Sequence, residues 1–217
     1  MLIAMRMPIE PMLLARAPKP FDSPDYAFEL KFDGVRMLAY CSGEVRLFNR
    51  RCHERTHVYT EVAADLRRIQ RGAVLDGEII APNADGRPDF YRLLKRDRTA
   101  DPSERLRRSI PVRYMVFDVL ETDGQNLTAL AYRERRGLLE ELFAATGRSD
   151  GTESNGTGFA CVDLTDVFPA SGEALFQAAC RENLEGIVAK RWDGEYRIGR
   201  RSDAWIKIKN PTYTRPK

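Results

Sequence analysis

The sequence predicts an α+β fold, and two features of the chain support this class. Short segments in which apolar and polar residues alternate, a pattern typical of half-buried strands, recur between residues 27 and 209. Segments with helical periodicity lie between them, but without the regular strand–helix rhythm of a doubly wound parallel sheet. Neither GxxxxGK[ST] nor GxGxxG occurs, which excludes the two common phosphate-binding loops.

The composition is that of a folded globular protein of 217 residues, enough for one medium domain or two small ones. Apolar residues make up 43% and charged residues 31% of the chain, so disorder is not expected. No segment approaches the roughly 20 apolar residues of a membrane span, and the N-terminus does not resemble a signal peptide. We therefore expect a cytoplasmic protein without membrane association, whose four separated cysteines stay reduced.

The N-terminal half is expected to contain four strands and one helix. Residues 1–26 include five prolines and are expected to form an extended lead-in without regular structure. Thr60 is the expected N-cap of a helix over residues 61–70, which Gly72 closes. Alternating patterns predict strands over residues 27–32, 36–40, 44–48 and 74–80.

The C-terminal half is expected to contain four helices and three strands. Ser171 is the expected cap of the last helix, and the segment 148–158, rich in small polar residues, is expected to be a flexible loop. Helices are predicted over residues 90–95, 103–108, 132–145 and 171–183. Strands are predicted over residues 113–120, 186–190 and 204–209.

The net charge is only +3, but basic residues concentrate in two segments. Residues 90–113 contain eight Lys or Arg against three Asp or Glu, and residues 190–217 contain nine against three. The rest of the chain is acidic, so the two segments favour a face that binds a polyanion. Solvated helix and tail surfaces would give the same counts.

Charged residues also recur on strand faces, where side chains alternate. Glu29, Lys31 and Asp33 share one face of the segment 28–33, and Gly34 and Arg36 follow. An exposed amphipathic strand would show the same pattern, so this segment alone is not decisive.

Three further predicted strands carry charges beside core positions: Asp76 and Glu78, Glu185 and Lys190, and Lys207 and Lys209. Together the four strands predict a pocket that contains several lysines and several carboxylates. Such a pocket suits phosphate chemistry, because carboxylates can hold Mg²⁺ and lysines neutralise charge on phosphoryl oxygens. Neighbouring cations and desolvation would also favour the deprotonated form that a lysine nucleophile needs.

These segments resemble the motifs of a known family. The segment 31–36, Lys-Phe-Asp-Gly-Val-Arg, resembles the KxDGxR signature of the covalent nucleotidyltransferases, which comprise DNA ligases, RNA ligases and mRNA capping enzymes. The segment 45–50 is similar to the one that carries the second signature arginine of ligases. Further segments resemble the family's remaining nucleotide-pocket motifs in order: residues 76–78, 114–118, 185–190 and 205–209. The resemblance covers about residues 10–210 and is strongest to bacterial and phage ATP-dependent DNA ligases, including the module used in bacterial end joining.

The resemblance implies a ligase core that uses ATP with Mg²⁺ or Mn²⁺. Lys31 would be the catalytic nucleophile that forms lysyl-AMP, and AMP would then pass to the 5′-phosphate of a DNA nick before sealing. The implied nucleotide-binding residues are Glu29 at the adenine amino group, Phe117 on the ring, Glu78 at the ribose, Arg36, Arg50, Lys190 and Arg200, and Lys207 and Lys209 at the α-phosphate. The implied supporting residues are Asp33, Gly34 and Asp76, and the implied metal ligands are Glu185 and Glu78.

The resemblance also implies an ATP-grasp-like nucleotidyltransferase fold, with antiparallel sheets flanked by helices and the nucleotide pocket between them. Residues 1–217 would form a single adenylation domain, a monomer that binds nicked double-stranded DNA through residues 90–113 and 190–217. The usual C-terminal OB-fold domain has no counterpart in these 217 residues, so impaired self-adenylation is expected. Cys52 stands where many relatives have glycine.

Two alternatives remain open at this point. An RNA ligase or a capping-type nucleotidyltransferase would share the same lysine chemistry. A non-catalytic module that binds a nucleotide or DNA is the alternative from a different class. The intact set of Lys31, Glu185, Lys207 and Lys209 argues against a module that has lost its chemistry.

Overall fold

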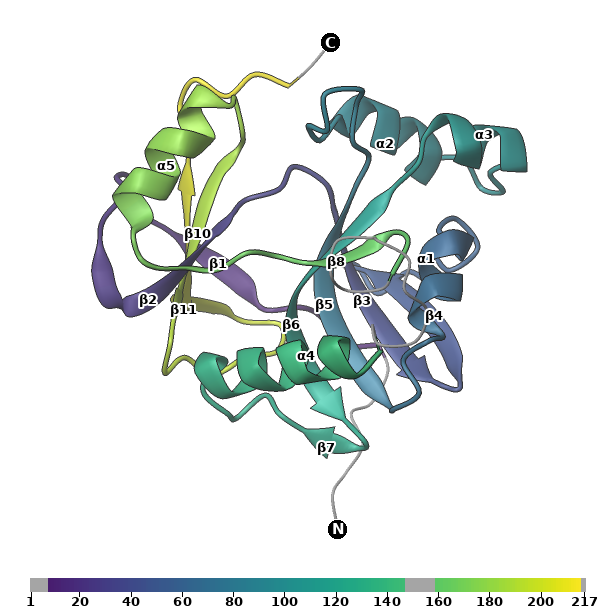
Figure 1. Ribbon diagram of the computed structural model, residues 1–217, viewed down its shortest axis with the longest axis horizontal. Coiled ribbons are helices and arrows are strands. Elements are labelled where there is room, and N and C mark those ends of the chain that lie inside the picture. The colour runs from purple at the N-terminus through teal and green to yellow at the C-terminus, as the bar shows by residue number, and fades with distance from the viewer. Residues whose placement is uncertain (1–7, 147–158, 216–217) are drawn as a thin grey trace.

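The computed structural model describes residues 8–146 and 159–215, and it consists of two twisted sheets with helices packed on their outer faces (Figure 1). The first sheet has the order β1-β11-β10-β2-β9 and is formed by β1 (Leu13–Arg16), β2 (Ser23–Leu30), β9 (Phe168–Ala170), β10 (Gly186–Arg191) and β11 (Arg201–Lys209). The second sheet has the order β4-β3-β5-β6-β7, with β8 beside β6, and is formed by β3 (Val35–Ser42), β4 (Glu44–Asn49), β5 (Ala73–Ile80), β6 (Arg113–Thr122), β7 (Gln125–Asn126) and β8 (Val162–Leu164). All strand pairs are antiparallel except β1–β11 and β6–β8, which confirms the predicted α+β class with antiparallel sheets.

Helices cover the two sheets from outside. The helix α5 (Gly172–Arg181) packs on β10 and β2 of the first sheet. On the second sheet, α1 (Thr60–Leu66) contacts β4, and α4 (Tyr132–Thr146) contacts β6. The helices α2 (Phe90–Asp97) and α3 (Glu104–Ser109) connect β5 to β6 and lie above the second sheet in Figure 1. No helix in the described residues is both long enough and apolar enough to cross a membrane.

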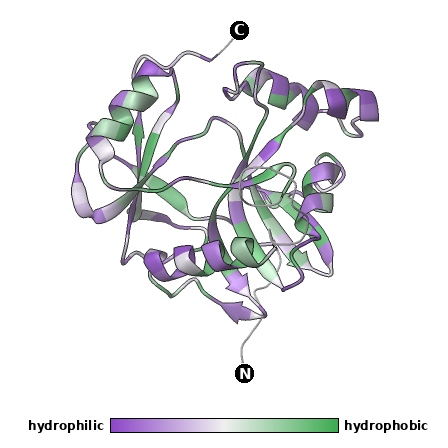
Figure 2. Ribbon diagram, in the orientation of Figure 1, coloured by the Kyte–Doolittle hydropathy of each residue, from purple (hydrophilic) through white to green (hydrophobic). Residues whose placement is uncertain are grey.

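Three apolar clusters hold this arrangement together, and green, hydrophobic stretches run along strands of both sheets in Figure 2. One cluster lies between the second sheet and its helices, and another lies between the first sheet and α5. The third joins the two sheets: Met12, Tyr196 and Trp205 meet Leu38 and other residues of the second sheet. Burying apolar area stabilises the fold by about 25 cal/mol per Å². The third cluster therefore fixes the spacing between the two sheets.

The prediction of an irregular lead-in over residues 1–26 is wrong in two places. β1 forms inside it, and β2 begins at Ser23 and ends at Leu30, before Lys31. β1 is an edge strand that pairs only with β11, and prolines are tolerated beside such a strand because its outer side needs no partner. An edge strand of four residues has too short an alternation to be recognised without its partner.

Helix α1 also differs from the prediction. Thr60 is its first residue and not its cap, and Tyr59 occupies the cap position without a side-chain hydrogen bond. The helix ends at Leu66, because Arg68 and Ile69 form the tighter turns in which each amide bonds the carbonyl three residues back. Ser171 is at the cap position of α5 but makes no capping bond, and the helix ends at Arg181. The short strands β8 and β9 were not predicted, and the expected loop 148–158 lies outside the described residues.

Candidate active site

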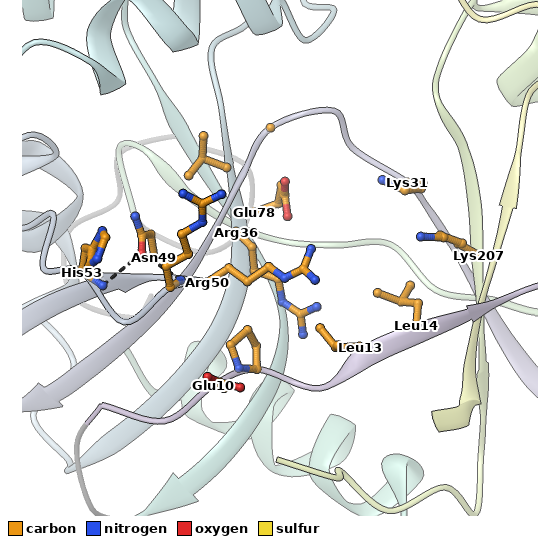
Figure 3. Close-up of a pocket in the computed structure, with 14 residues that line it drawn as sticks. Glu10, Leu13, Leu14, Lys31, Arg36, Asn49, Arg50, His53, Glu78 and Lys207 are labelled. Atoms are coloured by element: carbon orange, nitrogen blue, oxygen red, sulfur yellow. Dashed lines mark hydrogen bonds between the residues drawn. The ribbon is translucent and has the colours of Figure 1, made fainter. Parts of the chain in front are cut away.

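Lys31 lies at the junction of three cavities between the two sheets. The central cavity, about 890 Å³, is lined by residues of both sheets and is shown in Figure 3. The tail-side cavity, about 570 Å³, lies between Lys31 and the C-terminal segment 213–215. The apolar slot, about 70 Å³, is lined mainly by Leu14, Leu30, Phe117, Val188 and Trp205. The expectation of a pocket between the sheets is therefore met.

The position of Lys31 is fixed by the strand that follows Glu185. The amide of Lys31 donates to the carbonyl oxygen of Gly186 at 2.9 Å, so the chain continues alongside β10 after β2 has ended. Gly186 has φ +137°, and a Cβ at this position would overlap the carbonyl oxygen of Ile208. Glycine therefore lets β10 begin tight against β11, which places Glu185 beside Lys31.

Glu185 bridges two lysines at the edge of the cavities. Its Oε2 lies 2.5 Å from Lys31 Nζ, and its Oε1 lies 3.0 Å from Lys209 Nζ. The Glu185 and Lys31 side chains are 10% and 21% exposed, so the pair is only partly screened by solvent. Lys31 Nζ is thus held by the Glu185 carboxylate in an ion pair.

Lys207 adds a third cation on the same side of the central cavity. In Figure 3 the ammonium groups of Lys31 and Lys207 point from the first sheet toward Glu78 on the second. Partial burial lowers the pKa of Lys207, and the nearby charges of Lys209 and Lys31 lower it further. A cluster of cations that destabilise one another in this way is relieved by an anion.

Arg36 faces the same cavity from β3 and is held by a buried carboxylate. Its Nε and Nη2 donate to Asp76 at 2.9 and 2.5 Å, and its Nη1 donates to the carbonyl oxygen of Met12 at 3.0 Å. Asp76 is fully buried and also accepts a hydrogen bond from the Tyr196 hydroxyl at 2.7 Å. Burial disfavours the charged form, but Asp76 more than offsets this and raises the pKa of Arg36. The guanidinium is therefore fixed in one orientation.

Glu78 is the carboxylate that faces the lysines across the central cavity. Burial raises its pKa to about 7, although Lys31 and Arg36 pull the pKa down. Asp76 and Glu185 are close enough to raise it further. Gly34 packs against the same strand, since a Cβ there would overlap the carbonyl oxygen of Ile79. Glu78 can therefore change its protonation state near neutral pH.

The apolar slot combines aromatic walls with a buried ion pair. Phe117 and Trp205 meet edge to face with ring centroids 5.7 Å apart. Lys190 lies against both rings, with Nζ 4.5 Å from the Phe117 centroid and 4.4 Å from that of Trp205. Lys190 is 2% exposed, and its Nζ lies 2.6 Å from Glu29 Oε1. Desolvation lowers the pKa of Lys190 despite the attraction of Glu29.

Two residues that the sequence did not single out hold the carboxylate of Glu29, which lines the slot. The hydroxyl of Tyr132 donates to Glu29 Oε1 at 2.5 Å, and the hydroxyl of Thr165 donates to Glu29 Oε2 at 3.1 Å. Tyr132 starts α4 and Thr165 follows β8, so neither lies in a segment that resembles a motif. No sequence signal identifies them, because their importance arises only from contact with Glu29.

Arg50 lies on the opposite rim of the central cavity, in a turn after β4. The Asn49 side chain accepts hydrogen bonds from the amides of Arg51 and His53, each at 3.0 Å (Figure 3). Cys52 adopts φ +59°, the left-handed conformation that glycine adopts without strain. The turn forms with cysteine, and it leaves Arg50 exposed toward the cavity.

Five of the predicted site residues line neither the central cavity nor the slot: Asp33, Asp76, Glu185, Arg200 and Lys209. Of these, Asp76 binds Arg36, and Glu185 binds both Lys31 and Lys209. Asp33 was expected to share a strand face with Lys31, but the strand ends at Leu30 and the alternation stops there. Asp33 instead accepts hydrogen bonds from the Tyr213 hydroxyl at 2.9 Å and from Arg215 at 2.6 and 2.9 Å. The exposed Arg200 lines none of the three cavities.

The sequence and the fold both match known proteins. Residues 11–209 match the family described as ATP dependent DNA ligase domain. The SPbeta prophage-derived DNA ligase-like protein LigB of Bacillus subtilis (strain 168) is 34% identical over 210 residues, which are 95% of this chain and 69% of that protein. The multifunctional non-homologous end joining protein LigD of Mycolicibacterium smegmatis is 32% identical over 193 residues, which are 87% of this chain and only 22% of that protein.

Among solved structures, mycobacterial DNA ligase D complexed with ATP and MES matches with a TM-score of 0.74 at 29% identity, covering 93% of this chain and 60% of that one. The ATP-dependent DNA ligase from bacteriophage T7, complexed with ATP, shares the fold with a TM-score of 0.64. These names agree with the predicted DNA ligase and not with the RNA ligase or capping alternative. The chain belongs to the ATP-dependent DNA ligase domain family.

Proposed function

We propose that this domain transfers AMP from ATP to DNA through Lys31. The observation that carries the proposal is the position of Lys31, which borders the central cavity and the apolar slot at once. A nucleotide with its base in the slot would have its phosphates in the central cavity, beside Lys31 and Lys207. Lys31 Nζ would attack the α-phosphorus, the bond to pyrophosphate would break, and a lysyl-AMP phosphoramidate would form.

The second half of the reaction would act on a DNA nick. The AMP group would pass from Lys31 to the 5′-phosphate, which restores the free amine. The 3′-hydroxyl of the nick would then attack the activated phosphate, AMP would leave, and a phosphodiester bond would form. The family membership and the names of the DNA ligase relatives support DNA as the substrate.

The slot and the second sheet would hold the base and the ribose. Glu29 at the end of the slot would accept a hydrogen bond from the adenine amino group, with Lys190 beside it, and Phe117 would pack against the ring. Glu78 would bind the ribose hydroxyls from across the central cavity. Asp76 would act through Arg36, whose orientation it fixes.

The cations around the central cavity would hold the phosphates. Lys207 and Lys209 would contact the α-phosphate from β11, and Arg36 and Arg50 would approach from the second sheet. A phosphate beside Lys207 would also relieve the repulsion that lowers the pKa of this lysine. Arg200 would reach a phosphate only if its exposed side chain turned toward the cavity.

Lys31 must lose its proton before it can attack. Lys31 Nζ donates to Glu185 Oε2 at 2.5 Å, so this carboxylate is placed to receive the proton. The residues fit a Mg²⁺ or Mn²⁺ ion that is bound by one or two carboxylates and by phosphates, with Glu185 and Glu78 as its protein ligands. Within the described residues no cluster of three His, Cys, Asp or Glu could hold a metal alone, which agrees with a metal that arrives with ATP. Glu185 and Glu78 would hold such an ion, and its charge would neutralise that of the phosphates.

The exposed members of the two basic segments would bind nicked duplex DNA. In α2, α3 and the loop between them, the exposed cations include Lys95, Arg98 and Arg105, and Arg197 and Arg201 are exposed near β11. Arg96 and Lys190, which belong to the same segments, are buried and have internal partners. The interface is therefore smaller than the charge count alone predicted.

The test is covalent labelling with ATP that carries ³²P at the α-phosphate. We expect label on the protein in the presence of Mg²⁺, none after chelation, and none in Lys31→Ala. Lys19→Ala is the matched control, since Lys19 is exposed and lines none of the three cavities. Label on Lys31→Ala that equals the wild type would exclude Lys31 as the nucleophile.

A further inference from the structure

The carboxylate of Glu29 is almost completely occupied before any ligand binds. A carboxylate offers about four lone-pair positions, two on each oxygen. Oε1 receives the Tyr132 hydroxyl at 2.5 Å and the Lys190 ammonium at 2.6 Å. Among residues 8–146 and 159–215, Oε2 receives only the Thr165 hydroxyl, at 3.1 Å. One acceptor position therefore remains, on Oε2.

The three groups that donate to the Glu29 carboxylate come from both sheets. Glu29 and Lys190 lie on neighbouring strands of the first sheet, whereas Tyr132 and Thr165 adjoin the second sheet. Tyr132 is fully buried and stacks on Trp192, with ring centroids 5.7 Å apart. The amide of Arg133 also donates to the carbonyl oxygen of Trp192 at 2.9 Å, which ties the start of α4 to the end of β10. The Tyr132 hydroxyl is thus held rigidly against Oε1.

We propose that Tyr132 and Thr165 are positioning residues that set the base specificity of this domain, because they leave Glu29 with one fixed acceptor for the C6 amino group of adenine. The inference rests on the proposed adenine contact of Glu29. A glutamate side chain has three rotatable bonds, and an unrestrained carboxylate would turn to meet other partners. Here both acceptor positions of Oε1 are occupied, and the hydrogen bond from Thr165 fixes the orientation of Oε2. The remaining lone pair of Oε2 therefore points in one direction.

The chemistry of purines explains why a single fixed acceptor discriminates. Adenine presents an N–H donor at C6, whereas purine without a substituent presents none and hypoxanthine presents a carbonyl oxygen. Leaving a buried acceptor without a donor weakens binding, and placing it against a carbonyl oxygen adds electrostatic repulsion. Loosening the carboxylate should reduce this discrimination more than it reduces nucleotide binding as a whole.

The experiment compares the Kd of ATP with that of purine riboside 5′-triphosphate, which lacks only the amino group, by calorimetric titration. We expect the wild type to prefer ATP, and Tyr132→Phe and Thr165→Val to lower that preference about tenfold. Thr165→Ser keeps the hydroxyl and should keep the preference. Tyr26→Phe is the matched control: Tyr26 is on β2 with Glu29, and within the described residues no hydrogen bond of its hydroxyl is seen.

A purely structural role would give a different result. If both Kd values rise together and the preference stays unchanged, or if neither Kd changes, the inference is overturned. Thr165→Val nearly conserves volume, so it supplies the answer even if Tyr132→Phe unfolds. A wild type that labels Lys31 but binds both nucleotides equally would refute this inference and leave the proposed lysyl-AMP chemistry intact. A wild type that neither binds ATP nor labels Lys31 would refute the proposed function itself.

Discussion

At the residue scale, most charged side chains around the cavities are paired, and the proposed nucleophile Lys31 is among them. Asp76 and Asp33 are bound to arginines, and Glu29 is bound to Lys190. Glu78 makes no ion pair within the described residues and has the shifted pKa. Cys52 is unusual in its backbone and not in its side chain, because its φ lies in the left-handed region.

Cys52→Gly should stabilise the protein. The left-handed conformation costs a residue with a Cβ roughly 1–2 kcal/mol, and glycine avoids this cost. Part of the stabilisation is lost again, because glycine also raises the conformational entropy of the unfolded chain. We expect a net gain of about 0.5–1 kcal/mol in the free energy of unfolding, measured with urea. Cys52→Ser keeps the Cβ and should give no gain; equal stabilisation by serine would point to the thiol and not to the backbone.

Glu78 should make stability depend on pH. Its pKa is about 7 in the folded protein against 4.5 as its ordinary value, so the folded state holds the proton to higher pH than the unfolded state does. The free energy of unfolding should therefore decrease as pH rises from about 4.5 to about 7. Urea unfolding of wild type and Glu78→Gln across this range, with a chelator present, measures it. A difference between the two proteins that is constant with pH would contradict the shifted pKa.

At the element scale, the strands of the pocket could be predicted and the short edge strands could not. β5, β6, β10 and β11 are recognisable from their apolar residues. The structure places Glu78 and Lys207 at the central cavity, with Asp76 bound to Arg36 and Glu185 bound to Lys31. β1, β8 and β9 have three or four residues each, so their existence depends on the strand beside them. Asp33 was misplaced for a related reason: alternation predicts a face only while the strand lasts, and β2 ends at Leu30.

Gly186→Ala should separate β10 from β11 at the point where Glu185 is placed. A methyl group would overlap the Ile208 carbonyl oxygen, and φ +137° is strained for any other residue. We expect a loss of about 1–3 kcal/mol in stability and weaker labelling of Lys31 by ATP. Gly137→Ala is the matched control, because Gly137 lies in α4 and an added Cβ there would meet no atom within 4 Å. This substitution should gain about 0.5–1 kcal/mol in stability. Unchanged stability in Gly186→Ala would show that the strand pair can shift to accept the methyl group.

At the scale of the whole molecule, the charge distribution separates two tasks. Cations inside the cavities face a nucleotide-sized space, whereas the exposed cations of α2, α3 and the surface near β11 face solvent. The sequence predicted the two basic segments but could not separate these groups. Burial of Arg96 and Lys190 depends on how distant elements pack, and the counts treat every basic residue alike.

Replacing both Arg98 and Arg105 by alanine should weaken DNA binding without altering nucleotide binding. Both side chains are exposed, and each would neutralise one phosphate. The affinity for nicked duplex DNA should fall for all sequences alike, and the slope of log K against log salt should become shallower by about 2. Lys19→Ala combined with Arg67→Ala removes the same charge elsewhere on the surface and should leave the slope unchanged. An equal change in both pairs would mean that only net charge matters.

The junction position of Lys31 has a consequence for inhibitor design. The amine can be approached from the tail-side cavity, which is lined by Asp33, Arg87 and Arg215 and does not include the slot. A small compound anchored there could engage Lys31 without mimicking a purine. Such a compound would owe its selectivity to the C-terminal segment, and not to features that every ATP-binding protein shares.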